Sequence, residues 1–451
     1  MGRIFKGMWI TLLVVAVVGL AWVAYSRRST TVSENSTLCV SLETPMAESG
    51  VPNLFQAFGG EHRTLRDTVA MLRRAKTDTH IKAVVILPSG SSGLWAQVQE
   101  LRAAVADLRA SGKHVVAYLE SGDAQEYYLA SAANRILLMP GGSLDLTGLA
   151  TYELFFRGAL DKLGVSADML HIGDYKTYSN TFVEKGMTAA HREMNVALNR
   201  DQYDELVRAI AAGRGKTDIE VRAALDNGPY QGAGAVTAGL VDALAYEDQI
   251  DDTAPIAGTR RLTDDDYGVH GDAPGFRAPK IAVLYAVGDI ASGSSATSPT
   301  GGTTLGSDTF TRWIRKARGD KDVRAIVIRI DSPGGSAIAS EVIWRELMLT
   351  RDVKPVIVSM GDVAASGGYY IAVPAHVIVA EPGTITGSIG VVTGKFVVAG
   401  ALEKLGVGTA VVTDGARADM NSPFREFTPA ERAKVSQMMR ETYDDFVAKV
   451  A

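Results

Sequence analysis

The chain has 451 residues, of which 46% are hydrophobic and 22% are charged, and this length exceeds what one ordinary hydrophobic core accommodates, so we expect two or three domains. The net charge is −5 and there is no long basic run, which gives nucleic-acid binding no support. The single cysteine excludes an intrachain disulfide and any metal site built from several cysteines.

The N-terminal residues predict a membrane anchor. Residues 8–25 carry no charge and are flanked by basic residues on both sides. Such a stretch is close to the minimum length of a helix that spans the hydrocarbon core of a bilayer. Trp22 and Tyr25 suit the membrane interface, and the sequence around them is a poor cleavage site for a signal peptidase. We therefore expect residues 1–30 to be an uncleaved anchor, with an orientation that the flanking charges leave open.

Beyond the anchor, strand-like runs alternate with amphipathic segments. The apolar spacing predicts helices over 64–75 and 98–108, followed by strands over 83–87 and 115–119 respectively. An earlier strand contains Cys39, which we interpret as a small buried hydrophobe. This alternation indicates an α/β fold with a mostly parallel sheet and crossover helices.

The middle of the chain predicts a domain boundary. Residues 251–279 are polar and rich in Asp, Pro and Gly, which is typical of a linker. We therefore expect an N-terminal domain over 36–250 and a C-terminal domain over 280–451. Within the second domain, residues 293–306 consist mainly of Ser, Thr and Gly and predict a mobile loop.

Two glycine-rich turns in the second domain carry the strongest chemical signal. One reads Asp331-Ser-Pro-Gly-Gly-Ser336 and the other Gly361-Asp-Val-Ala-Ala-Ser-Gly-Gly-Tyr-Tyr370, and each follows a strand-like run. A serine at the end of a buried strand can begin a helix with its Oγ exposed, and a neighbouring diglycine turn can offer free N–H groups. Ser366 is therefore the candidate nucleophile. The candidate oxyanion donors are the backbone N–H groups of Gly334, Gly335 and Gly367.

The chain also repeats itself at a spacing of 242 positions. Ile81–Ile86 matches Val323–Ile328, and Tyr127–Ala130 matches Tyr369–Ala372 at the same offset. A constant offset over matched motifs predicts a tandem duplication of one domain and not a short-period solenoid.

The two copies differ at the positions where chemistry is expected. Ser366 of the second copy falls opposite Ala124 of the first, and Lys176 of the first copy falls opposite Ala418 of the second. Each copy thus keeps one group that the other lacks. This pattern predicts one active site assembled across the interface between the copies.

With these motifs, the sequence resembles the family of signal peptide peptidase A in its long double-domain form. Besides the two glycine-rich turns, the segments Gly173-Asp-Tyr-Lys176 and Thr386-Gly-Ser-Ile-Gly390 carry the resemblance. The resemblance implies a tandem duplication of a Clp protease/crotonase-like α/β domain, preceded by one N-terminal transmembrane helix.

The resemblance also implies roles for single residues. Ser366 matches the nucleophile of a serine–lysine dyad, Lys176 matches the general base, and Ser388 matches the serine that hydrogen-bonds the lysine. The oxyanion hole would be formed by backbone N–H groups at the diglycine turn and just after the nucleophile. No cofactor or metal is implied.

The implied activity is that of a membrane-anchored endopeptidase that degrades apolar peptides such as cleaved signal peptides. The implied location is the bacterial cytoplasmic membrane, with a single pass, a catalytic body on the periplasmic side and a homotetrameric assembly. No nucleic-acid partner is expected.

Two features depart from the family pattern. The diglycine motif often begins with Asn in the family, where this chain has Asp331, and such a change should leave a backbone donor unaffected. The first copy continues through Gly228–Gly232 and Gly239–Asp242, whereas the second copy ends at Ala451. We therefore expect the second copy to be shorter than the first.

Other readings of the motifs remain open. A non-proteolytic, membrane-anchored scaffold or pseudo-peptidase could share the fold. An acyl-CoA hydratase would need carboxylates near the oxyanion hole in place of Ser366. A Ser-His-Asp triad would need a histidine near that serine, and His376 is expected on a strand that leads away from it. The sequence contains no paired-histidine metallopeptidase motif and no Gly-x-Gly-x-x-Gly motif.

Overall fold

The computed structural model describes most of the chain. The described ranges are 32–49, 63–90, 93–253, 255–268, 278–298 and 302–451. The expected anchor over residues 1–30 lies outside these ranges, so it stays a prediction. Among the helices of the described ranges, none combines the length and the apolar character needed to cross a bilayer.

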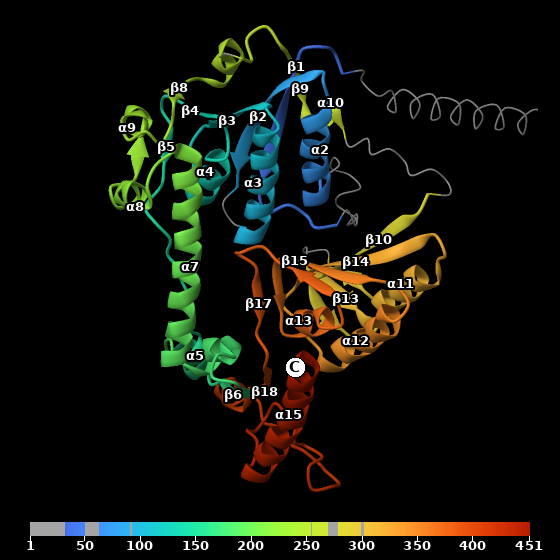
Figure 1. Ribbon diagram of the computed structural model, residues 1–451. Coiled ribbons are helices and arrows are strands. Elements are labelled where there is room, and N and C mark those ends of the chain that lie inside the picture. Colours follow the sequence, from blue (N-terminus) through green and yellow to red (C-terminus); the bar gives the residue numbers. More distant parts are fainter. Residues whose placement is uncertain (1–31, 50–62, 91–92, 254, 269–277, 299–301) are drawn as a thin grey trace, which may run out of the picture.

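The first half of the chain forms a six-stranded sheet in the order β8-β4-β3-β2-β1-β9, and every neighbouring pair is parallel. Helices α2, α3 and α4 pack beside it (Figure 1). The bounds are β1 (Ser36–Glu43), β2 (Ile81–Ser89), β3 (His114–Leu119), β4 (Arg135–Leu138), β8 (Ala243–Leu244), β9 (Arg260–Thr263), α2 (Leu65–Thr77), α3 (Trp95–Ala110) and α4 (Ala124–Ala130).

Local sequence explains these elements. Thr64 accepts a hydrogen bond from the Asp67 N–H, and the Asp67 side chain binds back to Thr64, so α2 begins with a capping box. The apolar positions of α2 and α3 face the sheet, and the interior positions of β2 and β3 are almost completely buried. The helices expected over 64–75 and 98–108 and the two strands that follow them are confirmed.

One strand lies where composition predicts a linker. β9 pairs in parallel with β1, and only Leu262 of its four residues is buried. Its other side chains face solvent because β9 is the edge of the sheet, so the segment is too polar to show a strand pattern. The short helix α10 (Asp264–Tyr267) follows it and packs its Tyr267 ring into the first core.

The second half builds another parallel sheet, in the order β10-β14-β15-β16, and β17 pairs with the end of β15. Helices α11 and α12 cover one face of it (Figure 1). The bounds are β10 (Lys280–Val287), β14 (Val323–Ser332), β15 (Val356–Ala365), β16 (Val377–Val379), β17 (Ile385–Gly387), α11 (Ser307–Gly319), α12 (Ala337–Arg351) and α13 (Gly367–Ala372). Both sheets fit a Clp protease-like α/β fold.

A small sheet stands where a mobile loop was expected. β11 (Asp289–Ala291) pairs in parallel with β13 (Thr303–Gly306), which pairs antiparallel with β12 (Ala296–Thr297). The strands are held mainly by backbone pairing. Their Ser, Thr and Gly side chains give no apolar alternation, so the sequence did not predict them. Residues 299–301, between β12 and β13, lie outside the described ranges.

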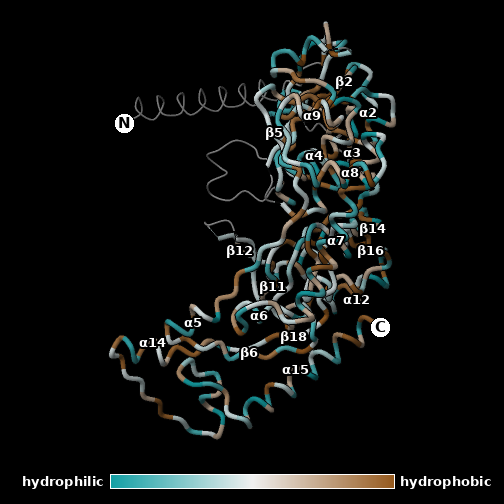
Figure 2. Tube along the Cα trace, turned by 90° about the vertical axis from the view of Figure 1, so that its left-hand side faces the viewer, coloured by the Kyte–Doolittle hydropathy of each residue, from teal (hydrophilic) through white to brown (hydrophobic). Residues whose placement is uncertain are grey.

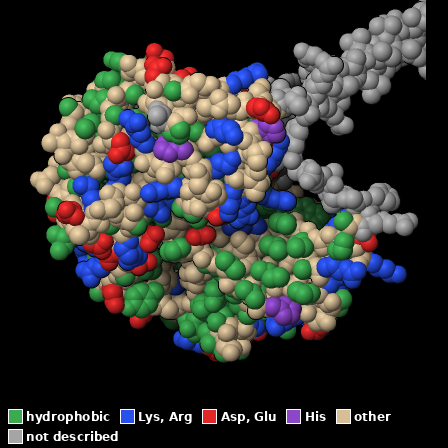
Figure 3. Space-filling model, turned by 45° about the horizontal axis from the view of Figure 1, so that its top comes forward, with side chains coloured by type: hydrophobic (Ala, Val, Ile, Leu, Met, Phe, Trp, Pro, Cys, Tyr) green, Lys and Arg blue, Asp and Glu red, His purple; other side chains and the backbone are tan. Residues whose placement is uncertain are grey.

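The two sheets differ in how the face that points away from their helices is covered. On this face of the first sheet, Ala245, Ile250 and Ile256 pack together with strand residues and complete a small core. In the second sheet, β16 leaves Val377 and Val379 each 53% exposed. Hydrophobic side chains gather on the lower part of the molecule in Figure 3, where the second sheet lies.

An arm joins the two halves at a distance from both sheets (Figure 2). Its centre is an antiparallel pair between β6 (Ser166–Ile172) of the first half and β18 (Val391–Val397) of the second. The long helices α7 (Ala189–Arg214) and α15 (Pro429–Val450) connect the arm with the two bodies (Figure 1). The remaining elements are β5 (Ser143–Leu144), α5 (Arg157–Leu163), η1 (Thr177–Ser179), α6 (Asn180–Val183), α8 (Asp218–Asp226), β7 (Tyr230–Gln231), α9 (Gly232–Thr237), η2 (Glu247–Asp252) and α14 (Ala399–Lys404).

Candidate active site

The arm delivers a lysine of the first half to a serine of the second. β6 ends at Ile172, opposite Val391 at the start of β18, and the chain then turns at Gly173. Lys176 follows this turn and is only 7% exposed. Its Nζ donates hydrogen bonds to the backbone oxygen of Ser388 at 2.7 Å and to Ser388 Oγ at 2.9 Å.

The surroundings of Lys176 disfavour its charged form. Burial lowers the pKa of the Lys176 ammonium to about 8, and no other cause contributes. The close packing at Gly390 helps to exclude water, since a Cβ on this glycine would lie 3.2 Å from Lys176 Cδ. A lysine with such a pKa is partly neutral near neutral pH and can accept a proton.

Ser366 stands at the junction between β15 and α13. Its φ of 52° and ψ of −116° are uncommon for a residue with a side chain. The backbone holds this conformation, because the Ser366 N–H donates to the Gly387 oxygen at 2.9 Å and the Ser366 oxygen accepts from the Tyr370 N–H at 2.9 Å. The Oγ makes no hydrogen bond within the described residues, so it is available to another partner.

The pairing of β15 with β17 brings Ser366 beside Ser388. Ala365 pairs with Gly387, and each is followed directly by one of the two serines. Lys176 therefore contacts Ser388, which follows β17 just as Ser366 follows the neighbouring strand β15. Its Nζ donates both of its hydrogen bonds to Ser388 and none to Ser366 within the described ranges.

The diglycine turn packs directly against Ser366. Gly334 has a φ of 104°, and a Cβ placed on it would lie 2.8 Å from Ser366 Cβ and 2.6 Å from the Gly367 nitrogen. Gly335 has a φ of 146°, and its Cβ would collide with the Ile290 backbone oxygen. Only glycine satisfies both the backbone conformation and the close approach at these positions.

The backbone N–H groups of this turn have different partners. The Gly334 N–H donates to Ser332 Oγ at 3.2 Å. Within the described residues, neither the Gly335 N–H nor the Gly367 N–H donates a hydrogen bond. The Gly335 nitrogen lies 3.3 Å from the place of a Cβ on Gly367, so the two free donors are neighbours beside Ser366. Two adjacent free N–H groups beside a serine can stabilise an oxyanion.

Two histidines that lie near the motifs in the sequence contact backbone groups away from Ser366 in the described part of the chain. His376 directly precedes β16, and its ring contacts the backbone of Val356. His171 lies on β6 and contacts the Gly173 oxygen. No group of three or more His, Cys, Asp or Glu residues in the described ranges could hold a metal ion.

Two neighbours of the site were not found from the sequence. Ser332 is completely buried, and its Oγ donates to the Gly288 oxygen at 2.6 Å while accepting from Gly334. Asp362 lies four residues before Ser366 and contacts α3 of the first half through Gln97. Both lie inside the glycine-rich motifs, but nothing in the sequence distinguished them from turn residues.

These features define the class of the protein as a mixed α/β protein with parallel sheets of the Clp protease type and a serine at a strand–helix junction. Comparison with known proteins identifies its family. A model of peptidase family S49 matches residues 107–256 and 349–451. The chain therefore belongs to peptidase family S49, and the family expected from the motifs is confirmed.

Three curated relatives illustrate the family. The chain is 34% identical over 411 residues to Protease 4 of Salmonella typhi, a match that covers 87% of this chain and 65% of the relative. It is 30% identical over 451 residues to Protease 4 of Haemophilus influenzae, covering 90% and 69%. It is 32% identical over 389 residues to the chloroplastic serine protease SPPA of Arabidopsis thaliana, covering 84% and 57%. The chain thus spans less than two thirds of the length of two of these relatives.

Proposed function

We propose that the chain is a serine endopeptidase in which Ser366 is the nucleophile, Lys176 the general base and Ser388 the residue that orients the lysine. The observation that carries this proposal is the contact of a buried lysine from one half with Ser388, the residue next to Ser366, from the other half. The relatives named as proteases support the same activity.

The proposed reaction follows from these positions. Neutral Lys176 accepts the proton of Ser366 Oγ as this oxygen attacks the carbonyl carbon of the peptide bond. The N–H groups of Gly335 and Gly367 stabilise the negative oxygen of the tetrahedral intermediate, and one such donor is worth about 3 kcal/mol. When the C–N bond breaks, the leaving amine takes the proton from Lys176. Water then hydrolyses the acyl-enzyme with Lys176 again acting as base.

We further propose that residues 36–250 and 280–451 are duplicated domains, and that the linker expected over 251–279 is shorter than its composition suggests, because Ile256, β9 and Tyr267 belong to the first sheet and its cores. Equivalent strands follow the same order, β4-β3-β2-β1 in one sheet and β16-β15-β14-β10 in the other. A repeated contact supports the duplication. Tyr128 donates to Glu205 at 3.1 Å in the first half, and Tyr370 donates to Asp445 at 2.8 Å in the second.

The homotetramer that the family resemblance implies has support from two unpaired segments. At the offset of 242, residues 149–155 of the first half correspond to β18, and residues 408–414 of the second correspond to β6. β6 and β18 pair with each other, whereas neither corresponding segment has a strand partner within the described ranges. We therefore infer that 149–155 of one chain pairs with 408–414 of a second copy, which would join chains head to tail.

The apolar substrate class has support from the surroundings of Lys176. Tyr175 and Tyr178 flank it in the sequence and are 54% and 67% exposed. The Tyr178 ring contacts Phe182, which contacts Phe396 across the arm. An aromatic surface of this kind suits an apolar peptide such as a cleaved signal peptide. The uncharged segment 8–25 would hold the enzyme at the cytoplasmic membrane, where such peptides remain.

Labelling of the full chain with a fluorophosphonate tests the activity class. We expect the wild type to be labelled and Ser366→Ala to be unlabelled and inactive toward an apolar peptide ester. An unlabelled wild type would instead leave a non-proteolytic scaffold or pseudo-peptidase as the function. Turnover that survives in Ser366→Ala would remove this serine from the mechanism.

A further inference from the structure

The strand that leads to the nucleophile carries a bulge. β14 and β15 pair residue for residue as far as Met360, and the next paired residue of β15 is Ala364. The three residues between them, Gly361–Val363, lie opposite a single residue of β14, Asp331. A bulge bends its strand and re-aims the residues that follow it. In this chain those residues lead directly to Ser366.

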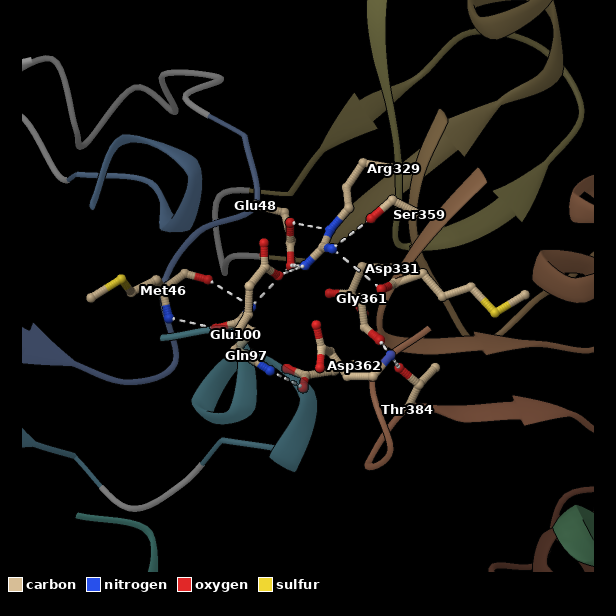
Figure 4. Close-up of polar contacts among 12 residues, drawn as sticks. Met46, Glu48, Gln97, Glu100, Arg329, Asp331, Ser359, Gly361, Asp362 and Thr384 are labelled. Carbon is tan, nitrogen blue, oxygen red and sulfur yellow. Dashed lines mark hydrogen bonds and ion pairs between the residues drawn. The ribbon is translucent and has the colours of Figure 1, made fainter. Parts of the chain in front are cut away.

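Two hydrogen bonds within the second half hold the bulge (Figure 4). Asp331 Oδ1 accepts the Val363 N–H at 3.0 Å, and Thr384 Oγ1 donates to the Gly361 oxygen at 2.9 Å. Thr384 lies just before β17, the strand that leads to Ser388. The bulge is thus fixed between the two strands that carry the site.

A third hydrogen bond ties the bulge to the first half. Asp362 is 6% exposed, and its Oδ1 accepts the Gln97 N–H at 3.0 Å, in the first turn of α3. Leu94, the N-cap residue of α3, has no side chain that could cap the helix. A carboxylate is well placed at a helix N-terminus, since the free N–H groups there point toward it. Asp362 therefore supplies from the second half the cap that α3 lacks.

Helix α3 contacts the other strand of the site as well. Gln99 Oε1 accepts the Gly383 N–H at 2.7 Å, in the turn before β17. The first two turns of α3 thus hold the segments that lead to Ser366 and to Ser388. The arm, through β6 and β18, is a separate connection between the halves and carries Lys176.

We propose that Asp362 is a positioning residue of the peptidase site, which fixes Ser366 relative to Lys176 by tying the bulge of β15 to α3. The proposal rests on the serine–lysine mechanism proposed above. Loss of the Asp362 hydrogen bond frees the bulge that leads to Ser366, whereas Gln99 with Gly383 and Arg329 with Glu48 and Glu100 still join the halves. A shift of about 1 Å between reacting groups is enough to lower a rate by about two orders of magnitude.

The charged groups near Asp362 indicate which substitution should preserve its role. The nearby cation, Arg329, binds Glu48 through two hydrogen bonds of 2.9 Å and also binds Glu100. Neither Asp362 nor Asp331 forms an ion pair within the described residues. Burial, with the nearby charges of Asp331 and Glu48, raises the pKa of the Asp362 carboxyl to about 6, although the hydrogen bond from the Gln97 N–H acts to lower it. A neutral side chain that keeps the acceptor oxygen should therefore serve almost as well.

The test compares Asp362→Ala with Asp362→Asn in the full chain. The measurements are the rate of fluorophosphonate labelling, kcat and KM on an apolar peptide ester, and Tm. We expect Asp362→Ala to lower the labelling rate and kcat by about tenfold or more with little change in KM. We expect Asp362→Asn to stay within about threefold of the wild type, because the amide keeps the hydrogen bond from Gln97.

Two further variants separate positioning from stability. Leu94→Asp in the Asp362→Ala background gives α3 a cap of its own, so Tm should recover while the labelling rate stays low. Asp123→Ala removes the side chain that caps α4 by accepting from the N–H groups of Gln125 and Glu126. This matched loss of a helix cap, which touches no residue of the second half, should lower Tm and leave labelling at the wild-type rate.

The outcomes distinguish this proposal from the one on which it rests. A wild type that is not labelled would overturn the serine–lysine mechanism itself. With a labelled wild type, normal labelling of folded Asp362→Ala would overturn the positioning role. So would equal losses in the Ala and Asn variants, or recovery of labelling together with Tm in the Leu94→Asp background. If Asp362→Ala does not fold by itself, the Ala and Asn variants are compared in the Leu94→Asp background. Labelling of the Ala variant at the wild-type rate would overturn the positioning role there too.

Discussion

Replacement of Lys176 by methionine should remove activity and at the same time change the pH dependence of stability. The ordinary pKa of a lysine is 10.5, and burial lowers that of Lys176 to about 8. Since one pKa unit corresponds to about 1.4 kcal/mol, keeping this ammonium buried costs about 3 kcal/mol. The neutral fraction at pH 7 is then about one tenth, compared with about 0.03% for an ordinary lysine.

The direction of the stability change follows from this lowered pKa. Between pH 8 and 10.5 the unfolded chain binds the proton of Lys176 and the folded chain does not, so stability rises with pH in this window. Below pH 8 both states are protonated and the full cost is present. The unfolding free energy of the wild type should therefore rise by about 3 kcal/mol relative to Lys176→Met between pH 8 and 10.5.

The assays are chemical denaturation of both proteins at several pH values, and the pH–rate profile of the wild type. The rate kcat/KM should rise with pH with its midpoint near pH 8, and Lys176→Met should be folded and almost inactive. The reasoning would be refuted by a midpoint near pH 10, by near-normal turnover of Lys176→Met, or by parallel stability curves for the two proteins.

Three further predictions concern neighbouring features of the site and the arm. Ser388→Ala removes the Oγ that Lys176 Nζ contacts at 2.9 Å, so kcat should fall by about tenfold while the fold is kept, as measured by steady-state kinetics and circular dichroism. Gly334→Ala places a Cβ 2.8 Å from Ser366 Cβ at a φ of 104°, so fluorophosphonate labelling should fall by about 100-fold or more, and wild-type labelling would argue against the described turn. Val412 is 98% exposed in the unpaired segment of the second half, so Val412→Asp should reduce the mass measured by light scattering without changing the fold, and an unchanged oligomer would exclude pairing through this segment.

The sequence predicted those parts of the site in which the chemistry lies in one contiguous motif. Ser366 and the diglycine turn were visible because small residues at the end of an apolar run have few other uses. The helix over 64–75 was visible because its cap and its apolar spacing are local. In contrast, the role of Ser388 came only from the family resemblance, since a serine in a turn carries no signal of its own.

The remaining features depend on contacts that no local pattern records. Asp362 and Gln97 are 265 positions apart, and each is an ordinary polar residue in its own segment. β9 is an edge strand with one buried side chain, so its polarity resembles that of a linker. The sequence could not show which of the two glycines has a free N–H. The answer depends on Ser332 Oγ, which accepts the Gly334 N–H and leaves that of Gly335 free.

The pairing of β6 with β18 has a consequence for how the protein responds to dilution. Because both strands belong to one polypeptide, the contact of Lys176 with Ser388 forms within a single chain. Its formation is governed by an effective concentration that the covalent connection sets, and not by the amount of protein present. A site built from two separate subunits would come apart at low protein concentration, whereas this contact should be populated to the same extent at any concentration at which the chain is folded.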